Sequence, residues 1–362
     1  MNDLQIKPDR RQLSPTAVRS FLSHTAKLFA TKPFQAHRIF GSGHAQTLAA
    51  WGWPHKYRFD QLEATQDQPR LFVINSETQV LGHCRWQTNR QESPTMVIWH
   101  GMEGSTDSGY MPSTARKAFR AGFNVVRVNY RNCGDTENLT PTLYHGGLSE
   151  DLRIVINELI QRDELKRIYP VGFSLGGNMV LKLLGEYGAE PPNEVVAAAV
   201  VSPSVDLQSS TNLIMARRNW LYHRNFVHSL KQRIRKKHDL YPDVYNLDEL
   251  PHIRTIRDFD EVFTARANGF ADAADYYYRM SSIRVVDKIS LPTLMIHSQD
   301  DPFIPIEPLR QSVFAHNPCL QLIATDRGGH VAFIAEKQRA EDRFWAENRL
   351  VEFCRLAEQQ LR

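Results

Sequence analysis

The stretch IYPVGFSLGGNMVLKLLGEYG, residues 168–188, decides the fold. It begins as a continuous apolar run, which is typical of a strand buried on both faces, and continues with apolar residues at helical spacing. Between the two lies the pattern Gly-x-Ser-x-Gly, made by Gly172, Ser174 and Gly176 and followed by Gly177. Small residues around a serine allow a sharp turn from strand to helix that lifts its hydroxyl above the sheet. The stretch therefore predicts such a turn with Ser174 at its tip.

Apolar runs and helical patterns alternate on both sides of this stretch. We expect eight strands, at residues 71–74, 80–86, 95–101, 123–130, 167–173, 195–202, 292–298 and 320–324. The last six are largely continuous apolar runs, as expected for strands buried on both faces of a parallel sheet. We expect helices near residues 113–121, 148–162, 175–187, 307–315 and 337–361. The alternation predicts an α/β fold with a mostly parallel central sheet and helices on both faces.

One long segment interrupts this alternation. Residues 206–290 carry helical pattern and aromatic residues but no convincing strand. An insertion of this length between two strands belongs outside the sheet, as a helical cap. We therefore expect four parts: an N-terminal extension packed on the core (1–65), the first part of the core with the serine turn (66–205), the cap or lid (206–290) and the second part of the core (291–362).

Composition and charge exclude several classes of protein. The 362 residues are 42% hydrophobic and 23% charged, which is the profile of an ordinary globular protein. A net charge of +4, from 44 basic and 40 acidic side chains, gives no indication of a nucleic-acid partner. The four cysteines contain no CxxC pair and are too scattered for a disulfide framework. With no signal peptide and no apolar run of about 18 residues, we expect a cytoplasmic protein without a membrane span.

A serine hydroxyl is a weak nucleophile, so the residues that could activate it must be sought elsewhere in the chain. It needs a histidine to accept its proton and a carboxylate to orient that histidine. After a serine turn of this kind the chain order should be serine, acid, histidine. Asp300 and Asp301 follow the strand expected at 292–298, and His330 follows two glycines in a loop before the last helix. Either aspartate fits the order, although aspartate before proline is also common in turns.

Acyl transfer also requires two backbone N–H donors for the oxyanion that forms. The residue after the nucleophile, Leu175, would supply one of them. The other should come from the loop after an earlier strand, and WHGMEGS (99–105) places Met102 there. The alternative is that these glycines only reverse the chain.

Several ordered motifs resemble one family. VGFSLGGNM, WHGMEGS, NYRNCGDTEN, SQDDPFIP and RGGHVAF are together similar to the YheT-like α/β-hydrolases, a branch with bacterial esterases and animal abhydrolase-domain lipases. The segment GSGHAQTLAAW (41–51) is similar to that family's Gly-His-x-Gln-Thr signature, so the resemblance extends from about residue 33 to the end. It implies an α/β-hydrolase fold in which Ser174 is the nucleophile, Asp301 the acid and His330 the base.

The chain departs from the family pattern at two positions. Asn132 stands in Arg-Asn-Cys where the family usually has Arg-Gly-Cys, and Ala45 replaces the usual leucine of the His-x-Gln-Thr segment. His145, in LYHGGLSEDL, matches a family motif, and we expect its role to be structural rather than catalytic.

The segment 217–238 is strongly basic. It carries eight Lys or Arg and no acid, interleaved with Trp220, Leu221, Phe226, Val227, Leu230 and Ile234. On a helix, the apolar residues would cover the active site while the charges face outward. The segment is then either a lid that contacts anionic lipid headgroups or, as we prefer, a solvated basic face balanced by the acidic stretch 239–261.

The sequence thus predicts a serine hydrolase that cleaves a carboxylic ester of a small molecule or lipid. The expected catalytic residues are Ser174, Asp301 and His330, with Met102 and Leu175 as oxyanion donors, and no metal or organic cofactor is required. An acyltransferase with the same residues and a non-catalytic lipid-binding protein remain alternatives. Dehalogenases and epoxide hydrolases are excluded, because they need an acid where Ser174 stands.

Overall fold

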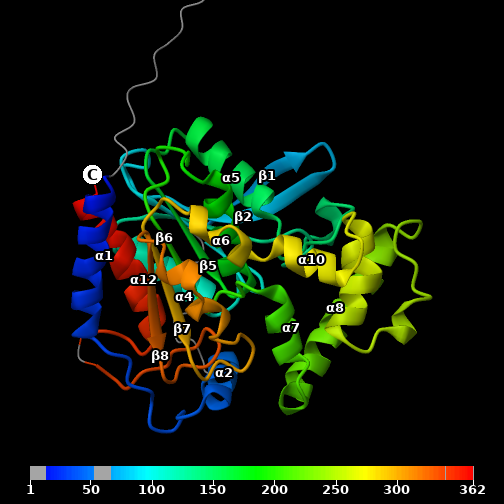
Figure 1. Ribbon diagram of the computed structural model, residues 1–362. Helices are drawn as coiled ribbons and strands as arrows, with labels where there is room; N and C mark the ends of the chain where they lie inside the picture. Colours follow the sequence, from blue (N-terminus) through cyan, green and yellow to red (C-terminus); the bar gives the residue numbers. More distant parts are fainter. Residues whose placement is uncertain (1–13, 53–66, 339, 362) are drawn as a thin grey trace, which may run out of the picture.

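The computed structural model describes residues 14–52, 67–338 and 340–361, which are organised around one sheet (Figure 1). Its eight strands are β1 (Gln68–Asn75), β2 (Thr78–Arg85), β3 (Thr95–Trp99), β4 (Asn124–Val128), β5 (Ile168–Phe173), β6 (Ala198–Val201), β7 (Thr293–Ser298) and β8 (Leu320–Thr325). They lie in the order β1-β2-β4-β3-β5-β6-β7-β8. The pairs β1–β2 and β2–β4 are antiparallel and the other pairs are parallel. The expected α/β fold and all eight expected strands are confirmed.

Helices cover both faces of the sheet. One face carries α1 (Pro15–Ala30), α4 (Tyr110–Arg120) and α12 (Trp345–Gln360), and the other carries α5 (Ser149–Gln161) and α6 (Leu175–Tyr187). Alternate residues of β3 divide between the two layers, since Met96 and Ile98 pack on the first face and Val97 and Trp99 on the second. Figure 1 shows α1 beside α12, and the rings of Phe21 and Phe353 lie 5.2 Å apart between them.

Three expectations about individual elements are wrong in part. The helix expected near 307–315 is two short pieces, a 3-10 turn at Pro308–Arg310 and α11 (Ser312–Ala315). The last helix begins at Trp345 rather than near residue 337, and Phe344, directly before it, forms a β-bridge with Ile334. β8 lies at the edge of the sheet and is partly exposed along its length, so the sixth apolar run does not mark a strand buried on both faces.

The segment between β6 and β7 lies outside the sheet, on the right in Figure 1. Residues 206–290, the cap segment, contain α7 (Leu207–Ile214), α8 (Trp220–Leu240), α9 (Ile256–Phe259), the π-helical turn η4 (Asp260–Ala265) and α10 (Ala273–Met280). They have a hydrophobic core of their own, which includes Ile234, Tyr245 and Phe259. Phe303 and Ile304, which follow β7, belong to the same cluster and attach it to the sheet.

The expected orientation of the basic segment 217–238 is wrong at four positions. Two of its apolar residues face outward, with Trp220 54% and Leu221 63% exposed. Two of its cations face inward instead: the Lys237 Nζ donates hydrogen bonds to the carbonyls of Glu137 and Thr140, and the Arg233 guanidinium contacts Glu103. Burial lowers the pKa of Lys237 to about 8.

The partners of these basic residues also differ from those we expected. Lys236 pairs with Asp135 and Glu137, each at 3.0 Å, and both acids lie in the loop after β4 rather than in the stretch 239–261. Part of the basic face of α8 is therefore used to hold the cap segment on the core.

The N-terminal region packs on the core where it is described. It contains α1 and α2 (Gly43–Gly52), whereas residues 1–13 and 53–66, which make up much of the predicted extension 1–65, lie outside the described residues. In the described parts of the chain no helix has the length and apolar character needed to cross a bilayer. All four cysteines are free thiols.

A carboxyl group is buried in the cap segment. Asp260 begins the turn η4, and its carboxylate accepts hydrogen bonds from the hydroxyls of Thr264, at 2.7 Å, and Tyr277, at 2.6 Å. Burial raises the pKa of Asp260 to about 6 despite these donors, because the charged carboxylate is less well solvated there than in water.

This shift makes the stability of the protein depend on pH through Asp260. A pKa raised above the unfolded value means that the group's contribution is complete below about pH 4 and is lost as pH rises through about 6. The side chain of Asp260→Asn cannot ionise, so the variant does not lose stability as pH rises through 6. The free energy of unfolding of the variant minus that of the wild type should therefore be higher at pH 8 than at pH 5, by about 1 to 2 kcal/mol. Denaturant titrations at both pH values, with the exposed Asp239→Asn as control, measure this. An Asp260→Asn difference that is the same at both pH values contradicts it.

Candidate active site

The serine turn between β5 and α6 has the backbone conformation that its glycines allow. Ser174 has φ 54° and ψ −117°, outside the usual regions for a residue with a side chain. A Cβ on Gly172 would lie 2.3 Å from the carbonyl oxygen of Gly176, and one on Gly176 would lie 2.5 Å from that of His100. No side chain fits at either glycine, so the chain can turn sharply and the hydroxyl of Ser174 stands at the carboxyl end of β5.

Ser174, His330 and Asp301 lie in one chain of hydrogen bonds. His330 Nε2 lies 2.9 Å from Ser174 Oγ, and His330 Nδ1 lies 2.8 Å from Asp301 Oδ2. An ionised carboxylate can only accept, so Nδ1 carries the proton and Nε2 turns its lone pair toward the serine. The other oxygen of Asp301 accepts the backbone N–H groups of Phe303 and Ile304 at 2.8 and 3.0 Å, which fixes the carboxylate.

The two neighbouring aspartates after β7 have different partners. Asp301 contacts the imidazole, whereas Asp300 accepts the backbone N–H of Gly329 at 2.9 Å. Asp300 thus holds the loop that carries His330 but not the ring itself. A second bond supports this loop, since Ser298 donates to the carbonyl of Gly329 at 2.8 Å.

The N-terminal signature segment holds the same loop from the other side. Thr47 Oγ1 accepts the backbone N–H of His330 at 2.9 Å, and the Gln46 amide exchanges hydrogen bonds with both backbone groups of Ile334. A Cβ on Gly43 would lie 1.8 Å from the carbonyl oxygen of Asp300, so only glycine allows this approach. Sequence reasoning recognised the Gly-His-x-Gln-Thr pattern but missed that it positions His330.

The loop after β3 lies against the serine. A Cβ on Gly101 would lie 3.0 Å from that of Ser174. The backbone N–H of Tyr130 donates to His100 Nε2, so Nδ1 carries the proton and donates to the carbonyl of Gly101 at 2.7 Å. Burial lowers the pKa of His100 to about 4, which keeps it neutral and structural. Met102, the next residue in this loop, lines the space beside Ser174.

This loop is also tied to the cap segment. Glu103 has φ 56°, and its carboxylate accepts the hydroxyl of Tyr144 at 2.8 Å and the guanidinium of Arg233 at 3.0 Å. Arg233 comes from α8 and also donates to the carbonyl of Asn132. One arginine of the basic segment therefore joins the cap segment to two loops beside the serine.

The structure explains one departure from the family pattern. Asn132 has φ 59°, the left-handed conformation that glycine adopts freely and that asparagine tolerates better than most residues. Its side-chain amide donates to the carbonyl of Thr142 at 2.8 Å. His145 accepts the backbone N–H of Gly147, and burial lowers its pKa to about 3, which fits the structural role expected for it.

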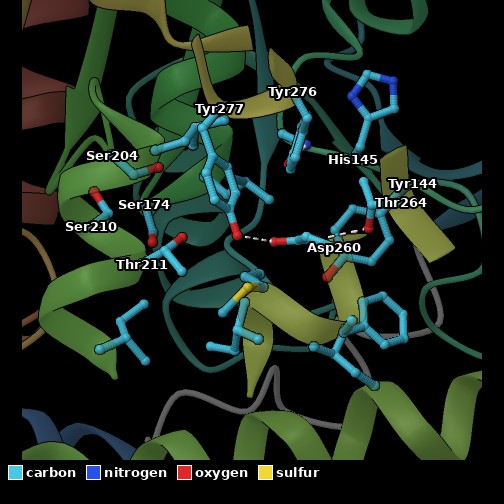
Figure 2. Close-up of a pocket in the computed structure, with 18 of the residues that line it drawn as sticks. Tyr144, His145, Ser174, Ser204, Ser210, Thr211, Asp260, Thr264, Tyr276 and Tyr277 are labelled. Carbon is cyan, nitrogen blue, oxygen red and sulfur yellow. Dashed lines mark hydrogen bonds between the residues drawn. The ribbon is translucent and has the colours of Figure 1, made fainter. Parts of the chain in front are cut away.

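Two pockets meet at Ser174. The inner pocket, with a volume of about 740 Å³ that includes its opening to solvent, reaches under the cap segment and is lined by Leu175, Ser204, Asp260 and Tyr277 among others (Figure 2). The outer pocket, with a volume of about 1480 Å³ that also includes its opening to solvent, has His330, Tyr222, Phe226 and Phe303 among its lining residues. Met102 and Ile304 contribute to both. Within residues 14–52, 67–338 and 340–361, no group of three His, Cys, Asp or Glu side chains could hold a metal ion.

Comparisons with known proteins agree with this fold. The family model described as alpha/beta hydrolase fold matches residues 94–337. Est1E from Butyrivibrio proteoclasticus has a similar structure, with a TM-score of 0.53 and 13% identity over 81% of this chain and 99% of that one. Esterase Pf2001 from Pyrococcus furiosus has a TM-score of 0.52 and 17% identity over 79% and 91%. Identities this low support the fold alone.

Relatives in sequence are closer. Over 317 residues, 86% of this chain and 90% of the relative, it is 32% identical to YheT of Escherichia coli (strain K12). It is 30% identical to the medium-chain fatty acid ethyl ester synthase/esterase 2 of Saccharomyces cerevisiae, over 83% and 73% of the two chains. The monoacylglycerol lipase of the same yeast is 31% identical over 70% and 57%. The chain belongs to the α/β-hydrolase family and is one of its YheT-like members.

Proposed function

We propose that this protein is a serine hydrolase that cleaves carboxylic esters of small molecules or lipids, with Ser174 as nucleophile, His330 as base and Asp301 as acid. The observation that carries the proposal is the chain of hydrogen bonds from Ser174 Oγ through the imidazole to the Asp301 carboxylate, at 2.9 and 2.8 Å. Two yeast relatives, named as an ethyl ester synthase/esterase and a monoacylglycerol lipase, support ester chemistry.

In the first half of the reaction Ser174 Oγ attacks the acyl carbon while His330 Nε2 takes its proton. The ester carbonyl oxygen becomes an oxyanion, to which the backbone N–H groups of Met102 and Leu175 donate. The tetrahedral intermediate then collapses, the alcohol oxygen leaves with the proton from His330, and the acyl group stays on the serine. Asp301 holds Nδ1–H throughout and stabilises the imidazolium.

In the second half an acceptor attacks the acyl-enzyme, giving its proton to His330, and collapse returns this proton to Ser174 Oγ as the product leaves. Water gives a carboxylic acid, and an alcohol gives a new ester. Hydrolysis is the principal proposal, and the name of the yeast synthase/esterase favours alcoholysis as a second activity. Product analysis with and without added ethanol separates the two.

The division of labour within the chain is part of the same proposal. Residues 66–205 would supply Ser174 and the oxyanion donors, and residues 291–362 would supply Asp301 and His330. The cap segment 206–290 would close the inner pocket. The N-terminal extension 1–65 would support the base, because Thr47 accepts the backbone N–H of His330.

A serine-directed fluorophosphonate probe tests the nucleophile. We expect the wild type to be labelled and Ser174→Ala to lose both labelling and esterase activity, because among the described residues no other serine hydroxyl is hydrogen-bonded to a histidine ring. Ser290→Ala, at an exposed serine, is the control and should be labelled like the wild type. Equal labelling of Ser174→Ala and the wild type refutes the assignment, and an unlabelled, inactive wild type favours a lipid-binding protein.

The adjacent aspartates provide a matched test of the acid. Asp301→Asn presents the imidazole with a side chain that no longer fixes its tautomer, and kcat should fall by about 10⁴-fold. Asp300→Asn keeps an oxygen that can accept the Gly329 N–H, so kcat should change by less than about tenfold. Steady-state kinetics on p-nitrophenyl esters measure both values. A larger loss from the Asp300 variant would transfer the role to that residue.

Thr47 is a positioning residue that acts through His330. Thr47→Val keeps the shape but removes the hydroxyl that accepts the His330 N–H, so kcat should fall about 10- to 100-fold with little change in KM. Thr47→Ser restores the hydroxyl and should recover most of the activity. Thr31→Ala, which loses an exposed hydroxyl bonded to its own helix, is the control. Equal activities of the Val and Ser variants count against this role.

A further inference from the structure

The direction of proton transfer indicates which of the two pockets at Ser174 holds the alcohol part of the ester and which holds the acyl part. This assignment rests on the proposed function. The leaving alcohol oxygen must receive its proton from His330, so the alcohol lies on the side that His330 lines. His330 contributes to the outer pocket and not to the inner one. The inner pocket, which Leu175 lines beyond the nucleophile, therefore receives the acyl group.

The inner pocket is not lined as a site for a plain hydrocarbon chain would be. The Asp260 carboxylate lines it, and Figure 2 shows Tyr277 and Thr264 bonded to that group. A carboxylate has about four acceptor sites, and these two hydroxyls use two of them. Asp260 can therefore accept further hydrogen bonds from a molecule in the pocket.

Two further observations point to a polar ligand. The hydroxyl of Ser204 is buried, lines the same pocket and has no hydrogen-bond partner among the described residues. Asp260 and Thr264 lie in the π-helical turn η4, and π turns inside helices occur frequently at functional sites. An alkyl chain alone would displace water from Asp260 and Ser204 without offering either group a hydrogen bond, which is unfavourable for buried polar atoms.

The inner pocket favours a neutral donor over a cation. The Arg233 guanidinium, which is paired with Glu103, also lines this pocket and offers an ammonium group no hydrogen-bond acceptor. An ammonium would in addition lose its hydration on entering the pocket, which costs far more free energy than the desolvation of a neutral hydroxyl. Both hydrogen bonds that Asp260 already accepts come from hydroxyl groups, and a substrate hydroxyl could donate to the same carboxylate.

We propose that the inner pocket selects acyl chains that carry a hydroxyl group, and that this hydroxyl donates a hydrogen bond to Asp260. The preferred substrates are then esters of hydroxylated carboxylic acids. Asp260 is a specificity-determining residue that takes no part in the proton transfers at Ser174.

Five p-nitrophenyl esters, which all share the same leaving group, test this proposal. They are the esters of octanoate, of its 8-hydroxy, 8-methoxy and 8-amino derivatives, and of 3-hydroxyoctanoate, which varies the position of the hydroxyl. The methoxy group has an oxygen but no donor. We expect kcat/KM of the wild type for one of the hydroxy esters to exceed those for octanoate and the methoxy ester by tenfold or more.

Variants locate the preference. Asp260→Leu removes the acceptor, and Asp260→Asn keeps one carbonyl oxygen without the charge, should the leucine variant fold poorly. For each variant we compare kcat/KM for the preferred hydroxy ester with kcat/KM for octanoate. This ratio should fall toward one in Asp260→Leu and should fall several-fold in Asp260→Asn. This ratio does not depend on the amount of active enzyme. Asp239→Asn, an exposed aspartate of α8, should keep the wild-type ratio.

Each other outcome refutes a distinct claim. A wild type that hydrolyses octanoate without preferring either hydroxy ester overturns the inference and leaves the proposed function intact. A preference that persists in both Asp260 variants overturns the role of Asp260. Faster turnover of the amino ester than of either hydroxy ester overturns it in favour of a cation site. A wild type that hydrolyses none of the esters refutes the proposed function itself.

Discussion

The backbone of Ser174 is the constraint on which the rest of the site depends. Its φ of 54° is costly for a residue with a side chain and persists only where the surroundings fix it. The Ser174 N–H donates to the carbonyl of Val201 at 2.9 Å, which anchors the turn to the next strand. Ser202 and Val331 also have positive φ values, and the Val331 N–H donates to the Ser202 hydroxyl. Strain is thus concentrated where β5, β6 and the His330 loop converge.

The sequence predicted the sheet well because five of its strands are buried on both faces and read as unbroken apolar runs. It misjudged elements whose environment depends on distant contacts. The run at β8 reads like the others, but its edge position leaves it partly exposed. The final helix starts later than expected, and Phe344, directly before it, forms a bridge with Ile334 that local pattern does not reveal.

The candidate site divides in the same way. Ser174 and His330 were predicted from a local motif and from chain order, whereas Asp301 was preferred to Asp300 only through the resemblance to a family pattern. The hydrogen bond between Thr47 and His330 joins residues that are 283 positions apart, so no local sequence pattern predicts it. Asp260 was missed for a different reason: its role depends on the path of the cap segment over the pocket, and an aspartate beside helical pattern reads as a surface residue.

The support that the N-terminal segment gives to the His330 loop has a consequence for modularity. A fragment beginning at β1 would retain the whole sheet and all three proposed catalytic residues. It would lack Gln46 and Thr47, which hold the loop that carries His330, and α1, which packs on α12. The unit that can be exchanged between proteins of this architecture is therefore larger than its sheet, and a recombination point that preserves the site lies before residue 43 rather than at the first strand.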